Sequence, residues 1–362
     1  MKSSRGINLV KKKRPNEISL EPGTIYFIGE RDLISGEETP YVKIGLTKLD
    51  RTGKEREADL KTGNPRELFI KHEEYVPLVH SVERALRYEF RLQNVLREWH
   101  VFRPDSPKKL TAAISSCQDL GREFAEYVPV IESARDLAKT ESKGEVTKVS
   151  TPEAEHWRRE YWLHNHILNL EKKATKKYTS LAKVALAEGK PAPIGTTTKE
   201  ETRQRVNWKR FEADHPEICA LFQIVSPVRD FDVKGKISQS DLSDPLVVEV
   251  QDRFNRFDLL LATQESEDSY YSDLFRQILM IEEISSFSTF RKELARCQLS
   301  VLCGNAPGIE GVLDWQTKHE SRLDTKAVES THLQLVDQYR EKQTILSTQT
   351  GAAGEFAGET EE

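Results

Sequence analysis

Short runs of apolar residues near the N-terminus predict two adjacent β-strands. The first, Gly23–Gly29, is rich in β-branched and aromatic residues between two glycines, which is typical of a buried strand. A polar, turn-forming stretch from Glu30 to Pro40 separates it from the second run, Tyr41–Leu46. We therefore expect a hairpin whose strands are joined by a long connection.

The segments that follow predict two helices on either side of a third strand. Residues 48–62 are expected to form a helix that ends before Pro65, because proline commonly follows the end of a helix. Residues 68–76 suit a strand. A second helix, amphipathic by the spacing of its apolar residues, is expected at 77–95, and a short edge strand at 99–102.

From about residue 107 onward the apolar spacing is mainly that of helices. Further helices are expected at 107–137, from 154 to a Gly/Pro/Thr-rich loop at 189–198, and at 200–213, 245–265, 269–283, 287–302 and 324–346. A stretch of Lys, Glu, Ser and Thr in the middle of the chain indicates a linker. No repeat at a fixed period is evident in this pattern.

The predicted fold class is α+β, with a small domain followed by a mostly α-helical domain. The small domain is expected to hold a three-stranded antiparallel sheet flanked by helices. The expected organisation is a basic flexible arm at 1–20, the small domain at 21–104, a helical extension at 105–137, a linker at 138–153, an accessory domain at 154–346 and a disordered acidic tail at 347–362.

Composition narrows the class of protein. The four cysteines are scattered without a C-x-x-C pair, which argues against a structural zinc site and against a disulfide framework. This usage fits a reducing, cytoplasmic location. No apolar run approaches the length needed to cross a bilayer, so no membrane partner is expected.

Charge is unevenly distributed along the chain. The net charge is −5, which by itself does not indicate a nucleic-acid binder. Within the first twenty residues, however, six basic side chains stand against Glu17 alone. Lys11, Lys12, Lys13 and Arg14 therefore form a candidate arm for contact with nucleic-acid phosphates, although a solvated terminus would have the same composition.

Two predicted helices carry a charged residue in the row that faces the core. Arg56 follows the apolar spacing of the first helix, and Glu83 follows that of the second. A charge in such a row is costly unless it is paired, binds a metal or lines a cleft. A buried Arg56–Glu83 ion pair would satisfy this spacing as well as a functional site would.

The strand residues Tyr26, Tyr41 and Lys43 add polar groups to the same region. Tyr41 and Lys43 share one face of their strand, because side chains alternate along it. An arginine can clamp phosphate oxygens, and a single carboxylate with waters can hold Mg²⁺ beside a phosphodiester. A tyrosine whose pKa is lowered by neighbouring cations could take a proton from an attacking water.

The ordered set of motifs resembles the GIY-YIG nuclease superfamily. The matching elements are Ile25-Tyr26, Lys43-Ile44-Gly45, a helix arginine at 56, Thr-Gly-Asn-Pro at 62–65, a helix glutamate at 83 and Glu98-Trp99. The set is most similar to the branch associated with phage and bacterial defence, whose second motif reads Lys-Ile-Gly. The resemblance covers residues 20–104, under a third of the chain.

The resemblance implies a role for each matching residue. Tyr26 would be the general base, and Lys43, in the place of a second tyrosine, would hold the nucleophilic water or help to deprotonate Tyr26. Arg56 would stabilise charge that develops on the phosphate. Glu83 would be the sole protein ligand of one Mg²⁺ or Mn²⁺. Asn64 and Glu98 match positions expected to be structural or close to DNA.

Two positions depart from the superfamily pattern in ways that bear on activity. Thr24 replaces the glycine of the first motif. Arg87 stands four residues after Glu83, where close relatives usually have histidine, and lies one helical turn away. A permanent Arg87–Glu83 pair would weaken metal binding, so Arg87 is a candidate modulator of the site.

The expected function is therefore Mg²⁺-dependent hydrolysis of DNA phosphodiester bonds by an endonuclease, in phage defence, restriction or mobile-element biology. The alternatives are a catalytically silent DNA-binding module and a protein-interaction factor. A protein partner or self-association would act through residues 154–346. A basic stretch on one predicted helix of that region favours nucleic acid: His156, Arg158, Arg159, Lys172, Lys173, Lys176 and Lys177.

Overall fold

The computed structural model describes residues 18–48, 52–61, 66–96, 98–102, 107–144, 147–188, 196–263 and 268–350. Lys11, Lys12, Lys13, Arg14 and Asn64, which the sequence proposes for DNA contact, lie outside these ranges, as does the end of the chain after Thr350. The described chain divides into two compact units. The first contains Met1–Ile131 with Thr289–Arg296, and the second contains Glu132–Ser288 with Cys297–Glu362.

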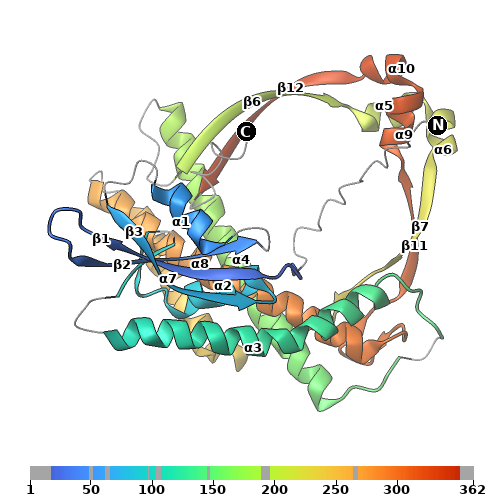
Figure 1. Ribbon diagram of the computed structural model, residues 1–362. Coiled ribbons are helices and arrows are strands. Elements are labelled where there is room, and N and C mark those ends of the chain that lie inside the picture. The colour runs from blue at the N-terminus through green and yellow to red at the C-terminus, as the bar shows by residue number, and fades with distance from the viewer. Residues whose placement is uncertain are drawn as a thin grey trace, which may run out of the picture. The chain divides into compact units, whose positions relative to one another are not determined.

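A five-stranded antiparallel sheet forms the centre of the first unit (Figure 1), with the strand order β3-β1-β2-β5-β4. Its strands are β1 (Gly23–Arg31), β2 (Glu38–Lys48), β3 (Glu67–Val76), β4 (Asn94–Leu96) and β5 (Trp99–Val101). The three strands predicted from the apolar runs are confirmed. The prediction of a three-stranded sheet is wrong, because β5 pairs with β2 and β4 pairs in turn with β5.

β5 confirms the short edge strand expected at 99–102, and only β4 was missed, because it is too short to carry a strand pattern. Two of the three residues of β4, Asn94 and Val95, were assigned to the end of the helix expected at 77–95. The helix itself, α2 (Val79–Glu89), ends earlier, and its buried side chains include Val79, Val82 and Leu86. After α2 the backbone hydrogen-bonding groups are satisfied by pairing of β4 with β5 and not by a longer helix.

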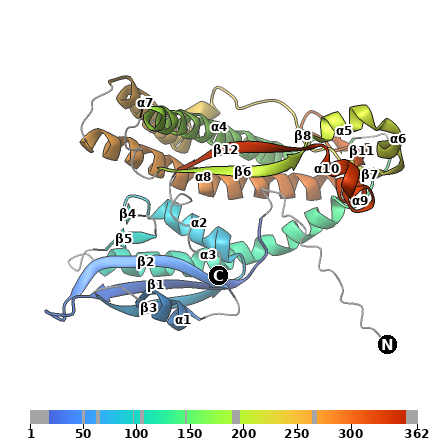
Figure 2. The same cartoon turned by 90° about the horizontal axis from the view of Figure 1, so that it is seen from above.

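The two faces of the sheet are covered by different helices. On one face Leu60 of α1 (Gly53–Lys61) packs against Tyr26, Ile28 and Leu68. The other face carries alternate residues such as Phe27, which are fully buried, and α2 contacts the same strands. Figure 2 shows α1 and α2 on opposite sides of the strands. The long helix α3 (Pro107–Leu137) follows the sheet in the chain.

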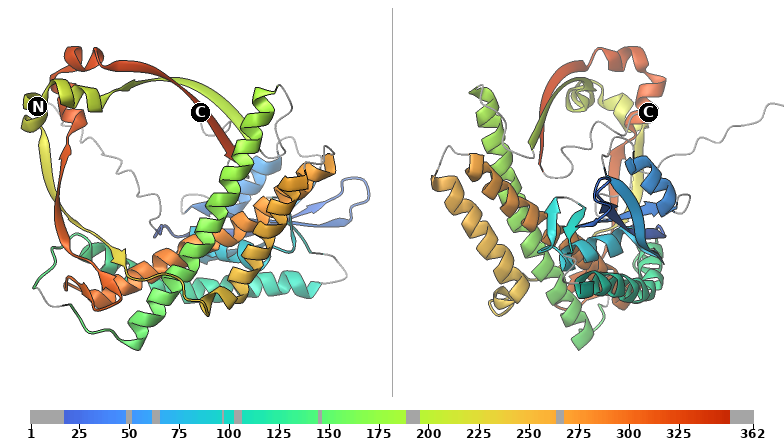
Figure 3. Two further views of the ribbon diagram at one scale, coloured as in Figure 1. Left: turned by 180° about the vertical axis from the view of Figure 1, so that it is seen from behind. Right: turned by 60° about the vertical axis from the view of Figure 1, so that its left-hand side comes forward.

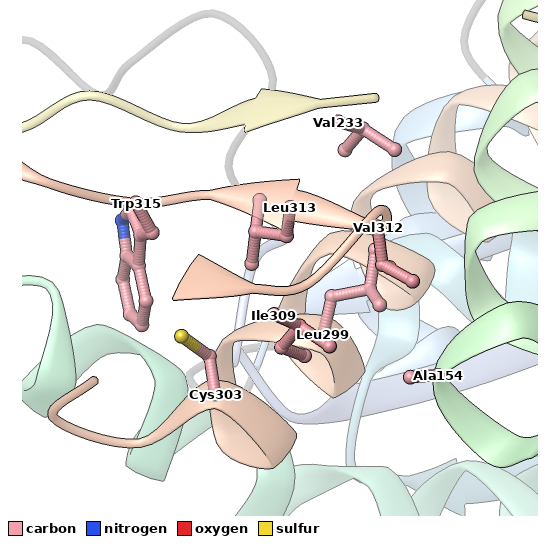
Figure 4. Packing of buried hydrophobic residues seen from close by; sticks show 8 residues of the cluster. All are labelled: Ala154, Val233, Leu299, Cys303, Ile309, Val312, Leu313 and Trp315. Carbon is pink, nitrogen blue, oxygen red and sulfur yellow. The ribbon is translucent and has the colours of Figure 1, made fainter. Parts of the chain in front are cut away.

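The second unit combines long helices with short strands. Its helices include α4 (Pro152–Ala187), α7 (Pro245–Thr263) and α8 (Asp268–Cys303), with a 3-10 turn at Asp241–Ser243; the eight residues of α8 from Thr289 to Arg296 belong to the first unit. A small sheet of β8 (Asp232–Val233), β10 (Leu313–Asp314) and β9 (Gly308–Ile309) packs on the end of α8. In Figure 4 the Trp315 ring lies beside the sulfur of Cys303 within this core.

The segment predicted as a linker is held by hydrogen bonds. The Lys148 amide donates to the Gly308 carbonyl oxygen at 3.0 Å. The Ser142 amide donates to the Thr317 hydroxyl at 2.7 Å. Its polar composition therefore reflects exposure on one side and not freedom of the chain.

Two antiparallel ribbons complete the second unit. β6 (Thr196–Val206) pairs with β12 (Arg340–Thr350), and β7 (Gln223–Arg229) pairs with β11 (Thr317–Leu323). Figure 3 shows β12, in red, lying along the length of β6. Four short helices join the ribbons: α5 (Trp208–Asp214), α6 (Pro216–Leu221), α9 (Thr325–Thr331) and α10 (Leu333–Asp337).

These ribbons contradict two helix predictions for the accessory domain, and two other predicted helices prove to be one. Residues 200–206 and 340–346 are strands and not parts of helices at 200–213 and 324–346, and the helices expected at 269–283 and 287–302 are one continuous helix. The ribbon segments are rich in Glu, Gln, Arg and Lys, which favour helix locally. Strands β6 and β12 find each other across more than a hundred residues of chain, where local pattern holds no information.

None of the helices in the described ranges is sufficiently long and apolar to cross a membrane. None of the four cysteines forms a disulfide bond.

Candidate functional site

Tyr26 lies at the centre of the sheet face that α1 covers. It is opposite Gly45 on β2 and opposite Glu73 on β3, and only 1% of its surface is exposed. Its ring lies over the backbone of Gly45, where a Cβ atom would come within 2.4 Å of the Tyr26 hydroxyl oxygen. The glycine of Lys-Ile-Gly therefore has a steric reason, since any side chain there would displace the tyrosine.

Arg56 reaches Tyr26 from α1. A capping box starts this helix: the Thr52 amide donates to a carboxylate oxygen of Glu55 at 2.7 Å, and the Glu55 amide donates to the Thr52 hydroxyl at 3.3 Å. The Arg56 guanidinium donates a hydrogen bond to the Tyr26 hydroxyl. About a third of the Arg56 side chain, 32%, is exposed, and it lies 3.8 Å from Asp59. Arg56 is thus held on its inner side and open to solvent on the other.

Lys43 and Glu98 form a close ion pair beside the tyrosine. The Lys43 ammonium lies 2.9 Å from a Glu98 carboxylate oxygen, and the Lys43 side chain is nearly buried. The Glu98 carbonyl also accepts from the Ile44 amide at 2.9 Å. The pair therefore joins β2 to the segment that begins β5.

Burial sets the protonation of Tyr26. Loss of solvation raises its pKa to about 12, and the carboxylates of Glu98 and Glu83 add to the rise. Arg56 opposes this effect but is outweighed. The expectation that neighbouring cations lower this pKa is wrong, because burial of the phenol exceeds their influence. Tyr26 carries its proton at neutral pH.

Glu83 lies half-buried on α2 and acts electrostatically on Tyr26. Arg87, one turn further along the same helix, acts on His100 of β5. His100 is fully buried, and its pKa falls to about 4, first because of burial and also because of Arg87. Its Nδ1 donates to the Glu98 carbonyl oxygen at 3.0 Å, while its Nε2 has no hydrogen-bond partner within the described residues.

The structure brings together the four residues that the sequence proposes as catalytic. Tyr26 interacts with Arg56 and Glu83, and Lys43 joins the group through Glu98. Glu98 has a larger part than the sequence assigned to it, since it pairs with Lys43 and raises the pKa of Tyr26 more than Glu83 does. In the sequence, the position of Glu98 directly before the predicted edge strand was the signal that could have indicated this role.

The donor set suits a divalent cation bound largely through water. Within the ranges described above, no group of three or more His, Cys, Asp or Glu side chains is arranged to hold a metal ion. Glu98 pairs with Lys43 at 2.9 Å, and Glu83 is the carboxylate that the family resemblance proposes as the metal ligand. Mg²⁺ keeps several waters and binds through one or two carboxylates together with substrate phosphates, so one ligand is compatible with it.

A scan against protein-family models found no match, and searches of curated proteins and of solved structures found none either.

Proposed function

We propose that the protein is a Mg²⁺-dependent endonuclease of the GIY-YIG type that hydrolyses DNA phosphodiester bonds in the cytoplasm. The observation that supports this proposal is that Tyr26 interacts with Arg56 of α1 and electrostatically with Glu83 of α2, with the Lys43–Glu98 pair beside it. The motif order of the sequence supports it independently. Phage defence, restriction and mobile-element biology are the settings in which such an activity is used.

Each residue contributes what its surroundings permit. Arg56, partly exposed, donates to the phosphate oxygens and stabilises charge that develops on them. Tyr26 accepts a hydrogen bond from Arg56 and is itself a donor, because it carries its proton. The Lys43–Glu98 pair joins β2 to the segment that begins β5. Glu98, held in this way, acts electrostatically on Tyr26. A base role for Tyr26 requires its pKa to fall when DNA binds.

Glu83 would hold the metal ion. When bound, Mg²⁺ neutralises negative charge at the scissile phosphate. Mg²⁺ keeps several waters, so water and substrate phosphate would fill the positions that Glu83 does not.

A nicking assay on supercoiled plasmid DNA in Mg²⁺ tests this function. We expect Tyr26→Phe, Arg56→Ala and Glu83→Gln each to lower the rate by about a hundredfold or more, as removal of a positioned catalytic group does. Glu126→Gln, an exposed glutamate of α3, is the matched control and is expected to cut like wild type. If Glu83→Gln cuts as fast as wild type, Glu83 is not the metal ligand.

The second candidate is a DNA-binding module without catalysis. The observation in its favour is that Tyr26 is almost wholly buried with a pKa of about 12, as in a structural hydrogen-bond network. Wild type that binds duplex DNA but leaves plasmid intact over a range of Mg²⁺ and Mn²⁺ concentrations would establish this alternative. Failure to bind any DNA would leave a protein-interaction role for residues 154–346.

A further inference from the structure

The four short helices between the two ribbons come from two copies of one sequence pattern. In the first copy Arg205, Lys209, Glu212 and His215 are spaced as are Arg322, Lys326, Glu329 and His332 in the second. Every pair is separated by the same 117 residues, from Lys209 to Lys326 for example. Each copy runs from a strand through two short helices into another strand. We call residues 196–229 and 317–350 together the duplicated unit.

Two hydrogen bonds of the first copy have direct equivalents in the second. Asn207 caps α5 by accepting from the Arg210 amide, and Asp324 caps α9 by accepting from the Ala327 amide, both at 3.1 Å. Between the copies, the Asn207 amide donates to the Tyr339 carbonyl oxygen at 2.9 Å. The equivalent Asp324 amide donates to the Phe222 carbonyl oxygen, also at 2.9 Å.

In side-chain packing and in strand register, too, each copy makes equivalent contacts to the other. The His215 ring contacts Tyr339 with 5.7 Å between centroids, and His332 contacts Phe222 at the same separation. The buried residues of the shared core are the equivalent pairs Phe211 with Val328 and Cys219 with Val336. In the ribbons, Val206 lies opposite Arg340 and Leu323 lies opposite Gln223, which are again equivalent positions. The duplicated unit therefore has a local two-fold axis within one chain.

Two of the shared residue types, the arginines and the lysines, form no hydrogen bond or ion pair among the side chains that the structure describes. The shared histidines make the ring contacts, and Glu329 binds Arg340. Arg205, Arg322, Lys209 and Lys326 are instead exposed, and no hydrogen bond or ion pair involves their side chains within the part of the chain that the structure describes. Arg205 has an acidic cross-strand neighbour, Glu341, but that carboxylate accepts from the Asn207 side chain at 3.0 Å.

Because these four cations recur at equivalent positions without an internal partner, they point to an external anionic partner with two-fold symmetry. The strands of duplex DNA are related by two-fold axes perpendicular to the helix, and two-fold DNA-binding proteins place equal groups on both strands. We propose that the duplicated unit is a docking surface for the sugar–phosphate backbone of duplex DNA, with Arg205 and Lys209 on one strand and Arg322 and Lys326 on the other. The inference rests on the proposed function in taking DNA as the partner, but its residues lie in the second unit.

A second copy of the chain is the less suitable occupant. The surface that a single strand–helix–helix–strand copy would offer to a twin is already filled by the other copy within the same chain. Four equivalent cations facing the same four cations of a second chain would also repel one another.

The test is equilibrium binding of the full-length chain to a 30-base-pair DNA duplex, followed by fluorescence anisotropy in EDTA over a series of salt concentrations. Each phosphate contact contributes about 0.9 to the slope of log Kd against log salt. We expect Lys209→Gln and Lys326→Gln to lower the slope equally, by about 0.9 each, and the double variant to lower it by about 1.8. Lys183→Gln with Lys236→Gln, two exposed lysines elsewhere in the second unit, is the control and should leave the slope unchanged.

The outcomes separate this inference from the nuclease proposal. A double variant that keeps the wild-type slope, or a wild type that does not bind the duplex, overturns the docking surface. So does a loss of slope from one copy alone. Sedimentation equilibrium that shows a wild-type dimer and a monomeric double variant would assign the surface to self-association instead. If the slopes fall as expected while wild type never nicks plasmid, the docking surface stands and the nuclease proposal fails.

Discussion

The hydroxyl of Tyr26 accepts a hydrogen bond from Arg56 and lies in the field of Glu98 and Glu83, while its ring is closed off from water. Single residues in this region owe their chemistry to such surroundings more than to their type. A phenol whose pKa is about 12 is a hydrogen-bond donor at neutral pH, and a lysine paired with a carboxylate at 2.9 Å orients a strand edge. Three predictions belong to this scale.

Gly45→Ala tests the contact between the second motif and Tyr26. The added Cβ atom would lie 2.4 Å from the hydroxyl oxygen of a buried ring, so the tyrosine must move. We expect a loss of about 1–3 kcal/mol in the free energy of unfolding in urea, as for other overpacked sites. Gly36→Asn is the control: Gly36 has a φ of 71° and open space around it, and asparagine tolerates this conformation. An unchanged midpoint for Gly45→Ala would contradict the ring placement.

The Lys43–Glu98 pair is expected to show strong coupling in a double-mutant cycle. Lys43→Met leaves the Glu98 carboxylate without its partner, and Glu98→Gln leaves a nearly buried ammonium. Each single change should destabilise the protein by about 1–3 kcal/mol, and the double variant by less than the sum, because no lone charge is left. Urea unfolding measures the cycle. Additive effects would mean that the pair contributes no interaction of its own.

His100 is expected to make the protein sensitive to mild acid. Its pKa is near 6.5 when unfolded and about 4 when folded, so the unfolded chain takes up the proton first as the pH falls. Stability is fully present above pH 6.5 and is lost toward pH 4, by about 2–3 kcal/mol from this group. His100→Phe should flatten that part of the curve of unfolding free energy against pH. His319→Gln, an exposed histidine, should leave the curve unchanged.

At the scale of elements, hydrogen bonds of Arg229 fix one end of the ribbon of β7 and β11. Arg229, the last residue of β7, donates to the carbonyl oxygens of Gly304 at 3.0 Å and Ala306 at 2.6 Å. It also bonds the Trp315 carbonyl at 3.2 Å, and its guanidinium lies 3.5 Å from the centre of the Trp315 ring. The buried guanidinium of Arg229 thus connects β7 to the turn after α8.

Arg229→Met is expected to destabilise the second unit by about 3 kcal/mol, because several buried carbonyl groups lose a charged donor. Arg229→Lys should recover less than half of this loss, since an ammonium has no planar fork and stacks poorly on an indole. Urea unfolding followed by tryptophan fluorescence gives the values. Arg256→Met, an exposed position on α7, is the control and should change the free energy by less than about 0.5 kcal/mol.

At the scale of the whole molecule, the proposed catalytic group and the proposed docking surface belong to different units. All members of the Tyr26 group belong to the first unit, and the duplicated unit belongs wholly to the second. Substitutions in one unit should therefore act locally on the stability of that unit.

Hydrogen exchange followed by mass spectrometry tests this division. Gly45→Ala should speed exchange in peptides from β1 and β2 and leave peptides from β7 and β11 unchanged. Arg229→Met should show the reverse pattern, because local opening follows local packing. If either variant speeds exchange to the same extent in both units, the chain opens as one cooperative body and the division is wrong.

Much of the first unit follows from the sequence alone. Strands β1, β2 and β3 were predicted from their own apolar runs, α2 from its apolar spacing, and α1 from the stop signals that follow it in the chain. Such information is local, since neighbours three, four or two residues apart decide it. The inward-facing positions of Arg56 and Glu83 stay a prediction, since the Arg56 side chain is 32% exposed and Glu83 is half-buried.

Only the tertiary structure decided the rest, because it depends on partners distant in the chain. Burial by several elements raises the pKa of Tyr26, and cross-strand pairing gives Glu98 its lysine. The Lys, Glu, Arg and Gln residues of β6 favour helix locally, and the segment forms a strand because β12 supplies its hydrogen bonds. The repeat of Lys, Glu and His spacing is present in the sequence, but its two-fold meaning became visible only when both copies were seen to exchange equivalent contacts.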